Sequence, residues 1–213
     1  MTDLNLLYEA ILKGKQKAAI EITNAAIAEK VATPKEMIDQ YMIKAMEEIG
    51  QRFEKQQAFV PELLMAGRAM KASLNILQPL LKEAGGDVSM GKVVIGTVKG
   101  DLHDIGKNLV GSMFEGCGFE VIDIGIDADS AKFIAAIKEH SANIVGMSAL
   151  LTTTMPYMKT VIDDLTTAGL RDKVKVMVGG APISEKFAME IGADGYSDSA
   201  NSAITKAKEL LAS

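Results

Sequence analysis

The sequence predicts an α/β protein in two parts, a four-helix bundle followed by a doubly wound parallel sheet of five strands. Three observations predict it. Apolar residues recur at three- and four-residue spacing from residue 1 to about residue 84, as they do on the buried faces of helices. Short apolar runs then alternate with helical stretches, which is typical of a parallel sheet with crossover helices. Gly85-Gly86 separates the two patterns, so we expect a linker there and domains at 1–88 and 89–213.

Four helices are expected in the first part. Gly14 marks the break between the first two. The third is expected to begin at Thr33-Pro34-Lys35-Glu36, which combines an N-cap hydroxyl, a proline at the first helical position and the glutamate of a capping box. Pro61 restarts the chain into the fourth helix. Because the links are short, these helices are expected to form a small bundle.

The second part is expected to contain five strands with helices between them. The predicted strands are Val93–Val98, Glu120–Ile124, Ile144–Met147, Val174–Val178 and Asp194–Ser197, and the predicted helices lie near 106–117, 129–140, 155–168 and 184–191. Right-handed crossovers place ligands beyond the carboxyl ends of parallel strands. Residues that directly follow the strands are therefore the candidates for a binding site.

Composition excludes several classes of protein. The net charge of −5, with no basic stretch, argues against a nucleic-acid partner, because that affinity comes mainly from neutralising phosphates. No apolar run approaches the roughly 18 residues of a membrane span, and Met1-Thr2-Asp3-Leu4 lacks the blocks of a signal peptide. A single cysteine, Cys117, excludes an internal disulfide framework. We therefore expect a cytoplasmic protein with no nucleic-acid or membrane partner.

The run Asp101-Leu102-His103-Asp104-Ile105-Gly106 follows the first predicted strand and is the strongest candidate site. With only two histidines, His103 and His140, and one cysteine, the chain cannot build a multi-histidine or thiolate metal cage. A metal already held by a macrocycle needs one axial ligand, which neutral imidazole supplies once a carboxylate orients its other nitrogen. Asp101 is the candidate for that carboxylate. His140 ends a predicted helix, where a cationic side chain favours the helix dipole and needs no function.

Two further motifs follow the third and fourth predicted strands. They are Ser148-Ala149-Leu150 with Thr152, and Val178-Gly179-Gly180. Taken alone, the glycines are also typical of a helix-capping turn, and Thr152-Thr153-Thr154 of an N-cap before Met155-Pro156. From the residues alone, a binding role and these structural roles both stay open for the two motifs.

The three motifs together resemble the B12-binding domain of cobalamin-dependent methyltransferases, including the B12-binding module of methionine synthase. The resemblance covers the whole chain. Phe59-Val60-Pro61-Glu62-Leu63-Leu64 is similar to the helical cap domain of that family, and the second part to its Rossmann-like, flavodoxin-like cobalamin-binding domain. A two-domain chain of this length resembles the corrinoid methyl-carrier proteins of methylamine, methanol and O-demethylase systems.

The resemblance implies a cobalamin or related corrinoid, bound base-off and histidine-on, that alternates between methylcob(III)alamin and cob(I)alamin. It implies His103 as the axial cobalt ligand and Asp101 as its hydrogen-bond partner. Thr154, where the best-known relatives have serine, would complete the relay. The residues that the resemblance places against the cofactor, whose nucleotide tail enters a slot in the sheet, are Asp101, His103, Asp104, Ile105, Gly106, Ser148, Leu150, Thr152, Gly179 and Gly180.

The implied function is a methyl carrier that is not a complete enzyme by itself. It would accept the methyl group from a substrate-specific, TIM-barrel methyltransferase and pass it to an acceptor methyltransferase of the thiol or tetrahydrofolate type, with a reductive activator as a further partner. Methylamines, glycine betaine, methanol and methoxylated aromatics all remain open as donors. The bundle would cover the methyl face, with Phe59 and Leu63 among the candidates to line it, and would swing on Gly85-Gly86-Asp87.

Two alternatives to the methyl carrier remain open. A B12-dependent sensor or regulatory module needs an output domain, and none is recognisable in this sequence. The cobalamin subunit of a carbon-skeleton mutase is the other alternative, against which the cap motif at Phe59-Val60-Pro61-Glu62 argues.

Overall fold

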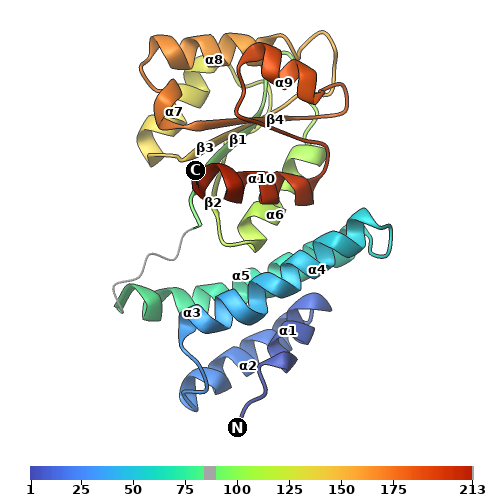
Figure 1. Ribbon diagram of the computed structural model, residues 1–213, viewed down its shortest axis with the longest axis vertical. Helices are drawn as coiled ribbons and strands as arrows, with labels where there is room; N and C mark the ends of the chain where they lie inside the picture. Colours follow the sequence, from blue (N-terminus) through green and yellow to red (C-terminus); the bar gives the residue numbers. More distant parts are fainter. Residues whose placement is uncertain (84–89, 213) are drawn as a thin grey trace. The chain divides into compact units, whose positions relative to one another are not determined.

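The computed structural model describes residues 1–83 and 90–212, which form two compact units (Figure 1). One unit is Met1–Ser89 with the short segment Glu115–Gly118, and the other is Met90–Phe114 with Phe119–Ser213. The predicted linker and hinge at Gly85-Gly86-Asp87 lie outside the described residues. Among the described residues, no helix has both the length and the apolar character that a membrane span requires.

The N-terminal unit is helical, as predicted. Its elements are α1 (Asn5–Leu12), α2 (Gln16–Ala28), α3 (Pro34–Met37), the π-helical turn η1 (Ile38–Met42), α4 (Ile43–Glu54) and α5 (Val60–Glu83). Because α3, η1 and α4 follow one another without a break, the described part of this unit contains the four predicted helical segments. The π-helical turn inside the third segment was not predicted from the sequence.

The start of α3 confirms the predicted capping box. The Thr33 hydroxyl accepts the Glu36 N–H at 3.2 Å, and the Glu36 carboxylate accepts the Thr33 N–H at 2.8 Å. Each side chain thereby satisfies a backbone donor that has no partner inside the helix. Pro34 occupies the first helical position, where its missing N–H costs nothing.

The second unit is the predicted doubly wound sheet. Its strands are β1 (Lys92–Thr97), β2 (Glu120–Asp123), β3 (Ile144–Ser148), β4 (Lys175–Gly179) and β5 (Gly195–Ser197), all paired in parallel in the order β2-β1-β3-β4-β5. Its helices are α6 (Ile105–Gly116), α7 (Ser130–His140), α8 (Tyr157–Thr167), α9 (Glu185–Ile191) and α10 (Ala200–Ala212), with a 3-10 turn at Arg171–Lys173. The five strands and the first four helices were predicted, whereas α10 was not.

Helices cover both faces of this sheet. Figure 1 shows α6 and α10 on one side of the strands and α7, α8 and α9 on the other. Strands with two covered faces are apolar throughout rather than alternating, and β1 is buried at every position after Lys92. The strand order reverses between β1 and β3, so a crevice is expected beyond their carboxyl ends. The loops after these two strands are therefore where a ligand is expected.

Candidate functional site

The candidate site lies where β1, β3 and β4 end side by side. Thr97 pairs with Ser148 in the strand register, and Ser148 pairs with Gly179. The predicted residues after three different strands are therefore brought to one edge of the sheet. The loop after β1 turns back on itself, since the Asp101 N–H donates to the Val98 carbonyl at 3.1 Å.

Asp101 lies at the centre of this site, with its side chain fully buried. Its Oδ1 accepts the His103 N–H at 3.1 Å and lies 2.6 Å from the ring Nδ1 of the same residue. Its Oδ2 accepts the N–H groups of Leu150 at 2.8 Å and Leu151 at 3.2 Å, both in the loop after β3. The Thr154 hydroxyl donates to the same Oδ2 at 2.8 Å. Five donors from two loops thus converge on one carboxylate.

These donors keep Asp101 ionised. Burial by itself would raise the pKa of this carboxyl, but the hydrogen bonds, led by the one from the Leu150 amide, outweigh burial and hold the pKa well below its usual range. An ionised carboxylate can only accept hydrogen bonds, so the proton between Asp101 and His103 belongs to Nδ1. The lone pair of the neutral ring is then on Nε2.

His103 is placed to offer that Nε2 to a ligand. Its side chain is 50% exposed, although the carboxylate that holds it is fully buried. The Thr97 hydroxyl donates to the His103 carbonyl at 2.7 Å, so the backbone is held as well as the ring. One oriented imidazole nitrogen fits a metal whose remaining positions are filled by a macrocycle.

Exposed apolar side chains accompany His103 in the loops that follow the first three strands and at the first residue of α6. They are Leu102, Ile105, Ile126, Leu150 and Leu151, with exposed fractions of 37% to 85%. Grouped exposed apolar residues in a ligand crevice are typical of a site for a large, partly apolar molecule. Sequence reasoning assigned roles to Ile105 and Leu150 and missed the other three. Their signal was an apolar residue in the segment between a strand and the helix that follows it.

The predicted glycines differ in what they do for the chain. At Gly106, a Cβ atom would meet nothing within 4 Å, so the protein's own packing does not require glycine. At Gly180, φ is +130° and a Cβ atom would lie 1.9 Å from the Ala149 carbonyl oxygen. At Gly179, it would lie 3.2 Å from the Ser197 carbonyl oxygen. The close approach of two loops therefore requires glycine at position 180, whether or not a cofactor is bound.

Gly180→Ala is therefore expected to lower the free energy of unfolding of the cofactor-free protein by about 2–3 kcal/mol, because overpacking adds to backbone strain. Chemical denaturation measures this. Gly169→Ala is the matched control, since Gly169 has a φ of +66° but open space around its Cβ position. It should cost only the strain, about 1–2 kcal/mol. Equal losses in the two variants would contradict the steric clash.

The remaining predicted residues lie around this network. Asp104 is exposed at the start of α6, where its carboxylate accepts the Asn108 side-chain amide at 3.1 Å. Ser148 is half-buried at the end of β3, and Thr152 is exposed. In the helical unit, Phe59 is 69% exposed and Leu63 is buried.

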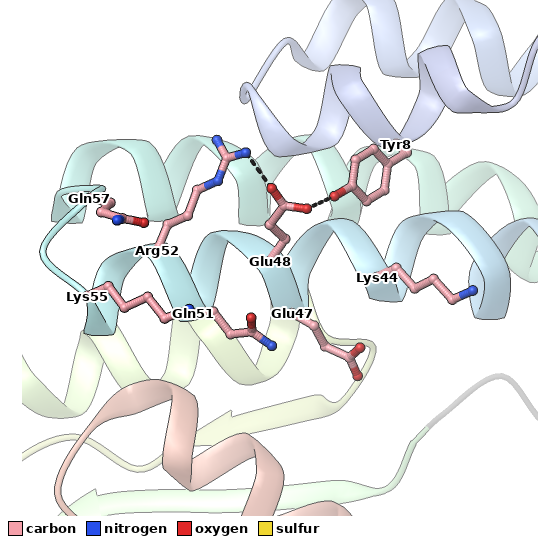
Figure 2. Close-up of a pocket in the computed structure, with 8 residues that line it drawn as sticks. All are labelled: Tyr8, Lys44, Glu47, Glu48, Gln51, Arg52, Lys55 and Gln57. Atoms are coloured by element: carbon pink, nitrogen blue, oxygen red, sulfur yellow. Dashed lines mark hydrogen bonds and ion pairs between the residues drawn. The ribbon is translucent and has the colours of Figure 1, made fainter.

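A polar groove of about 600 Å³ lies on the helical unit (Figure 2). Its lining consists of Tyr8, Lys44, Glu47, Glu48, Gln51, Arg52, Lys55 and Gln57. Figure 2 shows the Glu48 carboxylate between Tyr8 and Arg52, and both donate to it. Tyr8 belongs to α1 and Glu48 to α4, so the cluster ties two helices together. This role is structural, and the loops beyond β1 and β3 remain the candidate site.

Comparisons with known proteins find relatives over almost the whole chain. Two family models, each described as a B12 binding domain, match residues 91–205 and residues 4–78. The chain is 44% identical over 209 residues to a dimethylamine corrinoid protein of Methanosarcina barkeri, covering 98% of this chain and 97% of that one. It is 40% identical to a corrinoid protein of Desulfitobacterium hafniense, covering 99% and 98%.

Two solved structures are also similar to this chain over nearly its whole length. A cobalamin-binding protein from Desulfitobacterium hafniense has a TM-score of 0.81 at 33% identity and covers 99% of both chains. A chain of the methanol:cobalamin methyltransferase complex from Methanosarcina barkeri has a TM-score of 0.82 at 27% identity, covering 98% of this chain and 80% of that one.

Proposed function

The chain belongs to the B12-binding corrinoid proteins, and from this we propose that it carries a methyl group on the cobalt of a bound corrinoid, between two methyltransferases. The observation that carries the proposal is the buried Asp101 carboxylate, which five hydrogen-bond contacts surround and which orients the half-exposed His103 ring through Nδ1. The bound corrinoid would supply the metal that holds the methyl group. The protein would bind it, orient it and limit the access of water.

We place His103 as the axial ligand, with the corrinoid base-off and histidine-on. Asp101 would keep the proton on Nδ1 while Nε2 binds, and would stabilise the ring as a cation when Nε2 is released and takes up a proton. Thr154 would complete the relay by donating to the far oxygen of the carboxylate. This arrangement suits a ligand that must bind in one state and be released in another.

We place the nucleotide tail of the corrinoid along the edge of the sheet at Ser148 and Gly179, next to the first turn of α6. The open space around Gly106 supports this, because a Cβ atom there would meet nothing within 4 Å among the described residues. Asp104 and Thr152 are exposed and would contact the cofactor from the rim of the site.

A substrate-specific methyltransferase is the proposed donor partner. The relatives named dimethylamine corrinoid proteins favour a methylamine-type donor, and a relative found in a methanol:cobalamin methyltransferase complex supports direct association with such an enzyme. A barrel fold for that enzyme, an acceptor of the thiol or tetrahydrofolate type and a reductive activator complete the proposed system. The methyl group would be the upper ligand of the native cofactor, whereas a mutase subunit would carry an adenosyl group.

Isotope labelling tests the ligation directly. Uniformly ¹⁵N-labelled protein is loaded with unlabelled cob(II)alamin, and the electron paramagnetic resonance spectrum is recorded. A nitrogen from the protein splits each cobalt line into a doublet, whereas the cofactor's own ¹⁴N base gives a triplet. A doublet is expected. A triplet, or no nitrogen splitting, would overturn the base-off, histidine-on assignment.

Gly106→Ala is expected to separate stability from cofactor binding. Within a helix, alanine is favoured over glycine by about 0.5–1 kcal/mol, so the cofactor-free protein should be slightly more stable. The added methyl group should nevertheless weaken corrinoid binding, if the tail packs against this turn. Gly111→Ala is the control in the same helix, because its Cβ would make only ordinary contacts with Val121. Titration with cob(II)alamin measures the affinity of each variant. An unchanged affinity in Gly106→Ala would contradict the placement of the tail.

A further inference from the structure

Lys107 is a charged residue in a position suited to an apolar one. It lies in the first turn of α6, and its side chain is 2% exposed. Gly111, one turn later, faces the sheet side chains Val121 and Ile95, so Lys107 stands on the stripe of the helix that faces the sheet. A buried ammonium group is strongly destabilising unless it is paired. Its partners therefore determine what this lysine does.

The ammonium group reaches the carboxyl end of β2. It donates to the Asp123 carboxylate and, at 2.7 Å, to the Asn108 side-chain oxygen. Asp123 is the last residue of β2 and pairs with Ile95 of β1. Its second oxygen accepts the Gly125 N–H at 2.8 Å. Asp123 thus joins the start of α6 to the turn after β2.

The chain of hydrogen bonds continues from this turn to His103. The Gly125 carbonyl accepts the Thr97 N–H at 2.9 Å. Thr97 ends β1, is fully buried, and donates its hydroxyl to the His103 carbonyl at 2.7 Å. The loop that carries His103 begins after Thr97 and ends at Ile105, where α6 begins. Both ends of this loop are therefore connected through Asp123.

We propose that Lys107, Asp123 and Thr97 form a brace that holds the loop carrying His103 and thereby keeps its ring within hydrogen-bond distance of Asp101. Asp101 holds the amide and the ring of His103, while the brace holds its carbonyl and the start of the helix that follows. These three residues are positioning residues, since none of them offers an atom to a ligand of His103. The effect on cobalt ligation rests on the proposed function, whereas the effect on the His103 ring does not.

Two variants test the brace. Lys107→Met removes the ammonium group, and Thr97→Val removes only the hydroxyl in a side chain of similar shape. In the cofactor-free protein, at a pH where the ring is neutral, ¹⁵N resonances of the ring report which nitrogen carries the proton. We expect wild type to show the proton on Nδ1, and both variants to show a mixture of the two neutral forms. We also expect cob(II)alamin affinity to fall on the order of 10-fold in each, as for groups that orient a metal ligand.

Lys92→Met is the matched control. Lys92 pairs with Glu120 at 3.4 Å, at the opposite end of the same two strands, and both side chains are partly exposed. This control should leave the ring proton and the affinity unchanged. Thr97→Val keeps the test decisive if Lys107→Met does not fold.

The outcomes separate the two proposals. Unaltered ring resonances in a folded Thr97→Val variant would overturn the brace, even if the protein were less stable. Absence of protein-derived nitrogen splitting in wild type would overturn the histidine-on assignment instead, and would leave the ring measurement to decide the brace. Because Thr97 and Lys107 act in one chain, the double variant should lose less affinity than the sum of the two single losses.

Discussion

His103→Ala is expected to abolish the protein-derived nitrogen splitting of bound cob(II)alamin and to leave a folded protein. The half-exposed ring makes one side-chain hydrogen bond, to Asp101, and the backbone N–H at position 103 remains in the variant. Because the partner is a buried carboxylate, the loss in free energy of unfolding should be about 1.5–3 kcal/mol. The loss in corrinoid affinity should exceed the roughly 10–100-fold effect of removing a group that only orients a ligand. Resonance spectra, a cofactor titration and denaturation measure the three quantities.

His140→Ala is the matched control, because it removes the only other histidine of the chain. His140 ends α7, and its Nε2 lies 3.9 Å from the Glu139 carboxylate, which is largely exposed. Such pairs contribute little, so stability should stay within about 0.5 kcal/mol of wild type and the nitrogen splitting should persist. Loss of the splitting in this variant, with retention in His103→Ala, would reverse the assignment of the ligand.

The sequence was most informative where one periodic pattern decides the structure. Strands covered on both faces are continuous apolar runs, so β1, β3 and β4 could be predicted within a residue or two. The helix α10 was missed, although its buried residues Ala200, Ala203, Ile204 and Ala207 recur at helical spacing. Small alanines give a weak apolar signal. The π-helical turn has no sequence signal that we recognise.

The candidate site was predictable in part. Asp101 and His103 are two residues apart, and their contact is local. The contribution of the Leu150 and Leu151 amides could not be predicted, because backbone groups are the same for nearly every residue type and only the fold brings them to Asp101. The collision that requires Gly180 likewise depends on how closely two loops approach.

The contacts that form the brace could not be predicted from the sequence. Lys107, Asp123 and Thr97 lie on three different elements, and only the register between β1 and β2 relates them. A lysine in a helix near a charged residue is ordinarily interpreted as solvated. Its burial became evident only from the packing of α6 against the sheet.

Asp101→Asn is expected to disturb both the fold and the ligand, although the two side chains have nearly the same shape. Five donors face the two carboxylate oxygens in the native protein. An asparagine amide has one oxygen and a donating nitrogen, so donors face donors in either orientation. Buried donors without partners each cost about 1–3 kcal/mol, and we expect a loss of about 2–4 kcal/mol in the free energy of unfolding near neutral pH.

The same substitution should move the proton of His103. If the asparagine nitrogen faces the ring, it donates to Nδ1, and the ring proton must then be on Nε2, the atom that would bind cobalt. The corrinoid affinity should fall by about 10–100-fold, and ¹⁵N resonances of the ring in the cofactor-free protein should report the change of tautomer. An unchanged tautomer together with unchanged affinity would contradict the role proposed for Asp101.

The pH dependence of stability provides an independent measurement. The native pKa of Asp101 lies well below its ordinary value of 3.8, so the ionised carboxylate contributes stability that is fully present above that value and is lost as the pH falls toward the native pKa. Asparagine does not titrate, and the difference in unfolding free energy between wild type and Asp101→Asn should therefore shrink as the pH falls below about 4. Asp163→Asn removes an exposed carboxylate paired with Lys159 on α8 and should change stability by less than about 0.5 kcal/mol. A difference for Asp101→Asn that did not shrink on acidification would show that its carboxylate is not held ionised by the surrounding donors.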